Sequence, residues 1–312
     1  MNLLQLIERY IAHRQALGAR FRAEACMLRV FGRSVGSHAK VGAVRPEQVS
    51  AFLAGQGPIT RYWFAKYDAL RGFYGYAVSR GYVASAPLPT RLPRRPPPFV
   101  PYIYSREELR RLFETAAAYQ GRGSVVEAVT IHTFLLLLYG AGLRLCEAIN
   151  LDRADVDADQ AVLTIRQTKF GKTRLVPFGC QLGSALAQYA ARGPKRAARQ
   201  APFFTTPTGA RLKQRTVQRR FRHLCAQAGI RRSDARRYQP RLHDLRHTFA
   251  VHRLVSWYQQ GADVQRLLPQ LSTYLGHTSL SCTQIYLSMT PELLQEASAR
   301  FEHYAKEGYN HD

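Results

Sequence analysis

The sequence predicts a mainly α-helical protein of two domains, with a small β-hairpin in the second. Apolar residues recur at helical spacing along most of the chain, as in helices that bury one face. A proline-rich stretch, residues 87–104, breaks this pattern and predicts a linker between a domain at 1–86 and a domain at 105–312. Two short β-type runs that lie close to a glycine predict the hairpin.

The first domain is expected to be entirely helical. Apolar side chains at helical spacing mark its first helices, at Leu3, Leu4, Ile7, Ile11, Ala25, Leu28, Val30 and Phe31. A further helix is predicted between Arg61 and Tyr82, where we expect the aromatic side chains to pack in the core rather than stack on bases. Arg61, Lys66 and Arg71 fall outside the apolar positions of this helix and are expected to face outward.

The linker, residues 87–104, is both extended and basic. Its prolines exclude helix and favour a polyproline-like path, and it carries Arg91, Arg94 and Arg95. Two interpretations remain open. The segment is either a strap that lies along a phosphate backbone or a plain spacer between the domains.

The second domain is expected to surround its hairpin with helices. Ser105 and Glu108 have the spacing of a capping box and predict the start of a helix. A buried helix is predicted over residues 125–139, and the two hairpin strands over residues 161–168 and 173–178. Further helices follow, and the last of them, a tail helix, has an apolar stripe of Leu293, Leu294, Ala297, Phe301 and Tyr304.

Charge is the strongest signal in the composition. The 45 Lys and Arg residues outnumber the 21 Asp and Glu residues and leave a formal net charge of +24. Such a surface predicts a polyanionic partner. A membrane partner is disfavoured, because the most apolar run, residues 134–143, is much shorter than the ~20 residues of a transmembrane helix. Glu8 and Arg9 interrupt the N-terminal apolar pattern, so no secretory signal is predicted.

The cysteines predict a reducing compartment. The five residues are scattered singly and include no C-x-x-C pair. This usage is typical of reduced thiols, so we expect a cytoplasmic protein. No zinc site, no other metal site and no cofactor is predicted.

Two arginines stand in motifs that could carry chemistry. In GAGLRLCEAINL, Glu147 lies three residues after Arg144 and therefore on the same helical face. Taken alone, this pair is more simply a surface salt bridge. In RLHDLRHTF, His243 and Arg246 share a face at i and i+3, a spacing that is common by chance.

Further candidates lie on the hairpin tip and in the last motif. The tip, TKFGK, offers Lys169 and Lys172, which in isolation are ordinary solvated lysines. In YLGHTSLSCTQIY, Tyr274 precedes a Leu-Gly-His turn that ends at His277, and Tyr286 follows that histidine by nine residues. Each signal is modest, but the order Arg, Lys, His-x-x-Arg, His, Tyr is a specific constellation.

On these motifs, residues 140–289 resemble the catalytic domain of the tyrosine recombinase, or phage integrase, family. The similarity is strongest in GLRLCEAINL, HDLRHTFAVH and YLGHTSLSCTQIYL, and it extends more weakly into ALRGFYGYAVSRGY and the linker. The resemblance implies a helical core-binding domain and a mixed, mostly helical catalytic domain that close on DNA as a clamp. We expect the simple two-domain type, without an arm-binding domain ahead of Met1.

The resemblance also implies site-specific cleavage and rejoining of DNA through a 3′-phosphotyrosyl intermediate, with Tyr286 as the nucleophile. Arg144 and Arg246 would stabilise the charge that develops on the phosphate oxygens. A tyrosine with an ordinary pKa near 10 needs help in losing its proton, and His243 would act as its base or proton relay. His277 would hydrogen-bond the phosphate.

The remaining site residues follow from the same resemblance. Lys169 would protonate the departing 5′ oxygen, and Lys172 is the alternative if the turn is shifted. Glu147 would orient its neighbours, and Tyr274 would be a packing residue. Because the segment that carries Tyr286 is rich in small polar residues, we expect this tyrosine to stay out of the core.

The implied partner is double-stranded DNA with inverted-repeat core sites, bound by a homo-tetramer or together with related recombinases, for a mobile genetic element. We expect the protein in the bacterial cytoplasm, associated with the nucleoid. The tail helix could dock on a neighbouring protomer or pack in cis. The residues expected to contact DNA are Arg61, Lys66, Arg71, Arg91, Arg94, Arg95, Lys172, Arg174, Arg231, Arg232, Arg236, Arg237 and Arg241.

Two other functions remain open. A type IB topoisomerase would use similar residues to relax DNA as a monomer, without a defined site. An accessory protein would keep the fold and bind DNA without cleaving it. Formation of a covalent protein–DNA adduct on a defined site distinguishes the recombinase from both.

Overall fold

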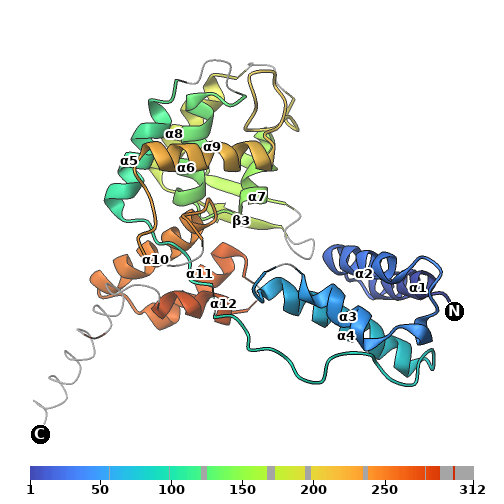
Figure 1. Ribbon diagram of the computed structural model, residues 1–312. Coiled ribbons are helices and arrows are strands. Elements are labelled where there is room, and N and C mark those ends of the chain that lie inside the picture. The colour runs from blue at the N-terminus through green and yellow to red at the C-terminus, as the bar shows by residue number, and fades with distance from the viewer. Residues whose placement is uncertain are drawn as a thin grey trace, which may run out of the picture. The chain divides into compact units, whose positions relative to one another are not determined.

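The computed structural model divides the chain into two compact units, Met1–Phe99 and Val100–Asp312 (Figure 1). The division falls inside the predicted linker, residues 87–104. The residues that the structure describes are 1–55, 57–97, 99–120, 125–166, 173–193, 198–234, 238–277, 279–288 and 298.

The first unit is helical, as predicted. Asn2 and Thr60 cap two of its helices by accepting hydrogen bonds from the backbone N–H groups of Leu4 and Tyr62. Val30, one of the apolar residues that mark its second helix, lies off the face that carries the buried Leu28, Phe31 and Ala25, and it is 48% exposed. The elements are α1 (Leu3–Ala16), α2 (Arg22–Val35), η1 (Val41–Ala43), α3 (Pro46–Ala54) and α4 (Arg61–Ser79).

The second unit is also mostly helical and contains a three-stranded antiparallel sheet of order β1-β2-β3. The predicted hairpin is confirmed as β2 and β3, which pair Leu163 with Val176, and the short β1 extends the sheet. Its elements are α5 (Arg106–Ala117), α6 (Ala128–Gly140), α7 (Leu145–Ile149), η2 (Arg153–Asp155), β1 (Val156–Asp157), β2 (Val162–Ile165), β3 (Arg174–Pro177), α8 (Cys180–Ala191), α9 (Gln214–Gln227), α10 (Asp244–Gln259), α11 (Val264–Leu275), α12 (Ser281–Gln284) and η3 (Ile285–Ser288).

Two details of the predicted helices can be compared directly. The capping box at the start of α5 is confirmed, because Ser105 and Glu108 exchange hydrogen bonds between side chain and backbone. The buried helix expected from residue 125 begins later, at Ala128, since the extended Glu127 precedes it as the N-cap. Apart from residue 298, the tail helix predicted around residues 291–305 falls outside the part of the chain that the structure describes.

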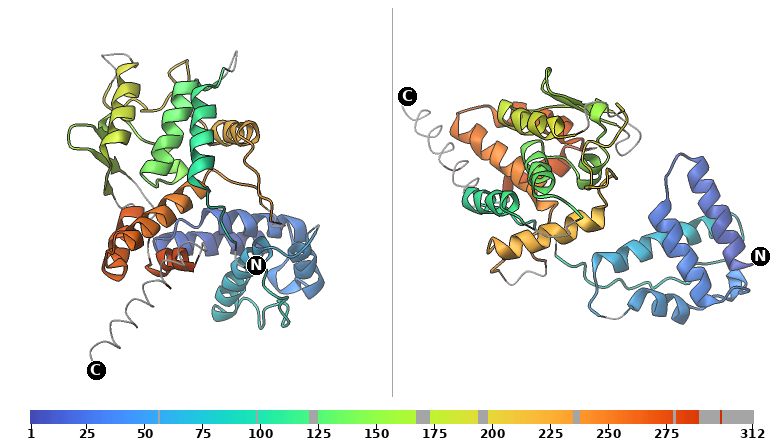
Figure 2. Two further views of the ribbon diagram at one scale, coloured as in Figure 1. Left: turned by 90° about the vertical axis from the view of Figure 1, so that its left-hand side faces the viewer. Right: turned by 90° about the horizontal axis from the view of Figure 1, so that it is seen from above.

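The second unit has two buried apolar clusters, and the smaller one positions the site. Helices α10, α11 and α12 group on one side of this unit, away from α8 and α9 (Figures 1 and 2). Their cluster includes Phe249, Leu254, Leu275 and Tyr286. Gly142, which has a positive φ of 58°, lies against it, and an added Cβ would approach Cδ1 of Phe249 to 2.5 Å. The loop after α6 can therefore reach α10 only with glycine at this position.

Candidate active site

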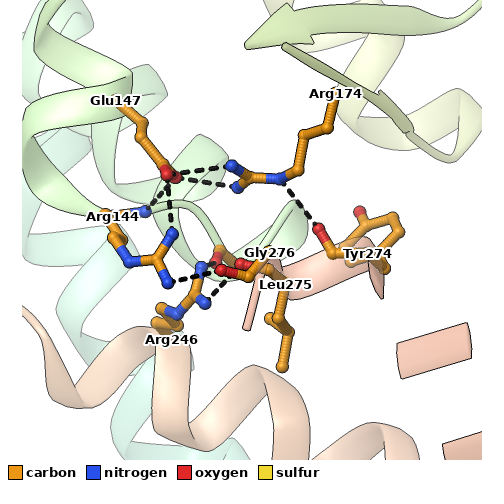
Figure 3. A network of polar contacts seen from close by, with 8 residues as sticks. Arg144, Glu147, Arg174, Arg246, Tyr274, Leu275 and Gly276 are labelled. Atoms are coloured by element: carbon orange, nitrogen blue, oxygen red, sulfur yellow. Dashed lines mark hydrogen bonds and ion pairs between the residues drawn. The ribbon is translucent and has the colours of Figure 1, made fainter. Parts of the chain in front are cut away.

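Glu147 is the centre of an ion-pair network. Arg144 is the N-cap of α7, so Glu147, at the third position of the helix, accepts the backbone N–H of Arg144 at 2.9 Å and its Nη1 at 2.8 Å. From β3, Arg174 donates Nη1 and Nη2 to the same carboxylate at 2.9 and 2.8 Å (Figure 3). Burial raises the pKa of Glu147, but hydrogen bonds and charges from Arg174 and then Arg144 outweigh it and lower the value to about 2.

Three arginines converge on the C-terminal end of α11. The Arg174 Nε donates to the carbonyl oxygen of Tyr274 at 3.0 Å, Arg246 Nη2 donates to that of Leu275 at 2.5 Å, and Arg144 Nη2 donates to that of Gly276 at 2.8 Å (Figure 3). Carbonyl groups at a helix end lack partners within the helix and carry partial negative charge. The end of α11 therefore fixes the guanidiniums of residues that come from three other segments.

Arg246 is the most enclosed of these arginines. It is 2% exposed, and its Nη1 donates to the carbonyl oxygen of Gly142 at 2.6 Å. Burial, followed by the nearby charge of Arg144, lowers the pKa of Arg246 to about 10. The guanidinium therefore stays charged at neutral pH in a place shielded from water, where its interaction with an anion is strong.

The Tyr286 hydroxyl lies in the same site and meets a histidine. Tyr286 comes from η3 and is 2% exposed, and its hydroxyl is 3.0 Å from Nδ1 of His247 on α10. The ring of His277 stacks on the Tyr286 ring at a centroid distance of 6.2 Å. The Nδ1 of His277 is in turn 2.7 Å from Oγ1 of the buried Thr283 on α12.

His247 and His277 are uncharged at neutral pH. Burial is the largest cause that lowers the pKa of His247 to about 3 and that of His277 to about 4, and the neighbouring Arg246 contributes to both shifts. Burial and Arg246 also lower the pKa of His243, the N-cap of α10. For Tyr286, burial raises the pKa, while Arg246 and then Arg144 act in the opposite direction.

The two tyrosines of the last motif differ in their surroundings. Tyr274 stacks on Phe249 at a centroid distance of 5.6 Å and donates its hydroxyl to the carbonyl oxygen of Pro177 at 3.0 Å, so it packs. The expectation that Tyr286 stays out of the core is wrong, since its ring belongs to the apolar cluster of α10 and α11. Of the small polar residues before it, Thr283 is buried and bonds His277.

Several residues expected to contact DNA already bind other parts of the protein. Arg174 donates to Glu147 and to the end of α11. Lys66 donates its Nζ to the carbonyl oxygen of Phe52 at 2.6 Å, and Arg232 donates to the carbonyl oxygens of Val100 and Pro101. Arg71 and Arg241 form ion pairs with nearby aspartates, and Arg95 lies over the Phe64 ring. The exposed residues of the set are Arg61, Arg71, Arg91, Arg94, Arg95 and Arg231.

Four predicted site residues fall outside the described residues, namely Lys169, Lys172, Arg236 and Arg237. Within the described ranges, no group of three or more His, Cys, Asp and Glu side chains is arranged to hold a metal ion. Over the same part of the chain, no helix combines the length and the apolar character needed to cross a bilayer.

Sequence reasoning missed two residues of the site. His247 directly follows the predicted Arg246 and lies four positions after His243, so it shares a helical face with His243. Thr283 precedes Tyr286 by three residues. Their positions in the sequence could be read in advance. The contact between His247 and Tyr286, however, depends on how η3 packs against α10.

Comparison with known proteins agrees with this geometry. Residues 104–292 match the model of the phage integrase family. The chain is 37% identical over 299 residues to the putative integrase/recombinase y4rE of Sinorhizobium fredii, which covers 94% of both chains. It is 33% identical to the tyrosine recombinase XerC of Chlorobaculum parvum, over 82% of this chain and 80% of that one.

Solved structures show the same fold. An integrase of the transposon Tn1549, in complex with transposon right end DNA, superposes with a TM-score of 0.71 at 16% identity, over 98% of this chain and 100% of that one. A λ integrase dimer bound to a core site gives a TM-score of 0.64, also at 16% identity, over 90% and 97% of the two chains. The family match spans more than half of the chain, and the relatives cover most of it. The chain belongs to the phage integrase family and is a tyrosine-type, site-specific DNA recombinase.

Proposed function

We propose that Tyr286 is the residue with which this recombinase attacks DNA, and that Arg144 and Arg246 hold the phosphate that it attacks. The observation that carries the proposal is electrostatic: Arg246 and Arg144 lie close enough to the buried Tyr286 hydroxyl to oppose the effect of burial on its pKa. The same two charges would stabilise the non-bridging oxygens of the five-coordinate phosphorus.

The hydrogen bonds of the two guanidiniums support this assignment. A guanidinium has five N–H donors, and bonds to described residues occupy two of them in each case. Arg144 bonds Glu147 and Gly276, and Arg246 bonds Gly142 and Leu275. Donors remain for a phosphate, while the bonded ones keep each guanidinium plane in place.

His277 and Lys169 complete the proposed chemistry. A neutral His277 whose Nδ1 is bonded to Thr283 can donate its Nε2–H to a phosphate oxygen. Lys169, or Lys172 as the alternative, is proposed to protonate the departing 5′ oxygen. The products are a 3′-phosphotyrosyl bond and a free 5′-hydroxyl, which can attack that bond and reseal the strand without ATP.

The substrate we propose is a pair of inverted-repeat core sites of a mobile element, held by a clamp of the two domains in a tetramer in the bacterial cytoplasm. The Tn1549 transposon integrase was solved with circular intermediate DNA, and the XerH recombinase with a palindromic substrate. The basic linker and the exposed Arg61, Arg91, Arg94 and Arg231 would contact the phosphate backbone.

The test is a trapping experiment on nicked DNA. Binding of the Tyr286→Phe protein to a randomised duplex pool selects a site, and a nick beside the cleavage point lets the 5′-hydroxyl fragment diffuse away. The full chain is expected to form a covalent adduct that survives a denaturing gel. Tyr286→Phe should form none, and Tyr274→Phe, its matched control, should form a normal amount. An adduct that persists in Tyr286→Phe would overturn the proposal.

A further inference from the structure

The Tyr286 hydroxyl is held by a histidine other than the one expected from sequence. His247 Nδ1 is 3.0 Å from the hydroxyl oxygen, and the two rings lie 5.6 Å apart between centroids. His243, the expected base, packs its ring edge-to-face against His247 at 4.9 Å. His243 therefore lies next to His247, and His247 lies next to the reacting oxygen.

The third histidine is committed elsewhere. His277 stacks on the Tyr286 ring, but its Nδ1 bonds Thr283. Among the described residues, the hydrogen-bond partner recorded for the Tyr286 hydroxyl is His247. Of the three histidines, His247 is thus the one in contact with the atom that must lose a proton.

Burial decides the direction of this hydrogen bond. The Tyr286 residue is 2% exposed, so water competes little for its hydroxyl proton. If Nδ1 of His247 carried the hydrogen, the tyrosine proton would be buried without an acceptor, which is costly. Donation from Tyr286 to an unprotonated Nδ1 satisfies both groups, and it is the arrangement from which a proton can be transferred.

The charges around His247 keep that acceptor available. Burial, followed by the facing groups His243, Arg241, Arg246 and His277 in that order, lowers the pKa of His247 to about 3. At neutral pH the ring is therefore uncharged. A DNA phosphate brings a negative charge into the same site and stabilises the protonated ring of His247. The basicity of His247 therefore rises when the substrate is bound.

We propose that His247 is the catalytic proton acceptor for Tyr286, with His243 beside it as a relay, an inference that rests on the proposed role of Tyr286. In the cleavage step the Tyr286 oxygen bonds to phosphorus, its proton moves to Nδ1 of His247, and the bond from phosphorus to the 5′ oxygen breaks. The 5′ oxygen takes its proton from the acid assigned to Lys169. During rejoining, His247 returns its proton to the leaving Tyr286 oxygen.

The same contact has a competing interpretation as a latch that holds Tyr286 back. The two interpretations predict opposite effects on the cleavage rate when His247 is removed. Loss of a base slows cleavage, typically by about 10²–10⁴-fold, whereas loss of a latch accelerates it. A contact that only supports the fold changes stability without changing the pH dependence.

The chain offers a matched control on the same helix. His252 pairs its Nδ1 with the Tyr139 hydroxyl at 2.9 Å, so it is a second His–Tyr pair on α10. Asparagine places a polar atom near the position of Nδ1 but has no basic nitrogen. His247→Asn and His252→Asn therefore remove the same group, and only the first removes it from Tyr286.

The experiment measures single-turnover cleavage of the nicked duplex between pH 6 and pH 9.5. We expect His247→Asn to cleave about 100-fold more slowly at pH 7 and to gain rate as pH rises, because a growing fraction of the tyrosine is then ionised without help. His252→Asn should cleave normally. A 5′-bridging phosphorothiolate, whose sulfur leaves without a proton, should not rescue His247→Asn.

Three results would overturn the inference: an unchanged or faster rate in His247→Asn, an equal loss in His252→Asn, or rescue by the phosphorothiolate. If His247→Asn does not fold, as judged by circular dichroism, His247→Gln provides the same comparison. If the unsubstituted chain forms an adduct and Tyr286→Phe does not, Tyr286 remains the nucleophile even if the role proposed for His247 is wrong. If the unsubstituted chain forms no adduct, the proposed function itself is wrong.

Discussion

The two halves of the proposed active site differ in how they carry charge. On one side, Arg144, Arg174 and Arg246 are charged and are bonded to Glu147 or to the carbonyl end of α11. On the other side, His247 and Tyr286 are uncharged and share one hydrogen bond. Groups that hold a phosphate must be charged before it arrives, whereas groups that exchange a proton must be able to change charge. The comparison shows that the permanently charged arginines and the hydrogen bond through which a proton could move belong to two separate sets of contacts.

The largest expected effect comes from weakening the charged half at Arg246. An ammonium cannot span the carbonyl oxygens of Gly142 and Leu275 and still face a phosphate, so Arg246→Lys loses geometry while it keeps charge. Loss of one preorganised donor typically costs about 10²–10³-fold in rate. We expect a loss of that size in single-turnover cleavage. The control Arg253→Lys, on the same helix, should cleave normally, and equal rates for the two variants would contradict the assignment.

Removal of the shared carboxylate should cost stability next. In Glu147→Gln, Arg144 and Arg174 lose the charge that they share, and breaking a buried ion pair typically costs about 3–5 kcal/mol. Denaturant unfolding measures this loss as a lower midpoint. A variant as stable as the unsubstituted chain would show that the network does not hold α7, β3 and α11 together.

The pH dependence of stability sharpens the same point. The pKa of Glu147 is lowered to about 2 from an ordinary value near 4.5. Its stabilising contribution is therefore complete above about pH 4.5 and is lost as pH falls toward 2, and it amounts to about 3 kcal/mol. We expect Glu147→Gln to lose stability less steeply than the unsubstituted chain over this range. Parallel pH profiles of unfolding free energy would contradict the ion-pair account.

A smaller effect is expected at the end of α11. Gly276 has a φ of +65°, and an added Cβ would lie 3.0–3.2 Å from the Arg174 guanidinium. Gly229 has the same φ but no atom within 4 Å of such a Cβ, so Gly229→Ala carries only the backbone strain of about 1–2 kcal/mol. Gly276→Ala should be more destabilised than Gly229→Ala in thermal unfolding. Equal losses would show that Arg174 moves aside freely.

The smallest effect is expected in the uncharged half, at Thr283. Thr283→Val keeps the shape of the side chain but removes the hydroxyl that bonds His277 Nδ1, so His277 is no longer held in one tautomer. One hydrogen bond contributes about 1 kcal/mol, which corresponds to roughly a 5-fold slower cleavage. Thr283→Ser retains a hydroxyl and should retain the rate. Identical rates for valine and serine would exclude a positioning role.

Much of this architecture was predictable from sequence, and the exceptions share one physical cause. Helical spacing predicted α4, and β-type runs predicted β2 and β3, because these patterns report local structure. The motifs also singled out Arg144, Arg246 and His277, which lie close to Tyr286, but they missed His247 and Thr283. The role of Arg174 was not predictable, since its partner Glu147 lies 27 residues earlier in the chain. Neither was the pairing of Tyr286 with His247 rather than His243, which depends on packing between α10 and η3.

The most direct test of the account is to identify the residue that carries the DNA. After trapping on the nicked duplex, nuclease and protease digestion leave a peptide that bears a 3′-linked nucleotide, and mass spectrometry locates the modified side chain. The account predicts that the nucleotide is attached to Tyr286 through its phenolic oxygen. Attachment to Tyr274 or to any other residue would contradict it.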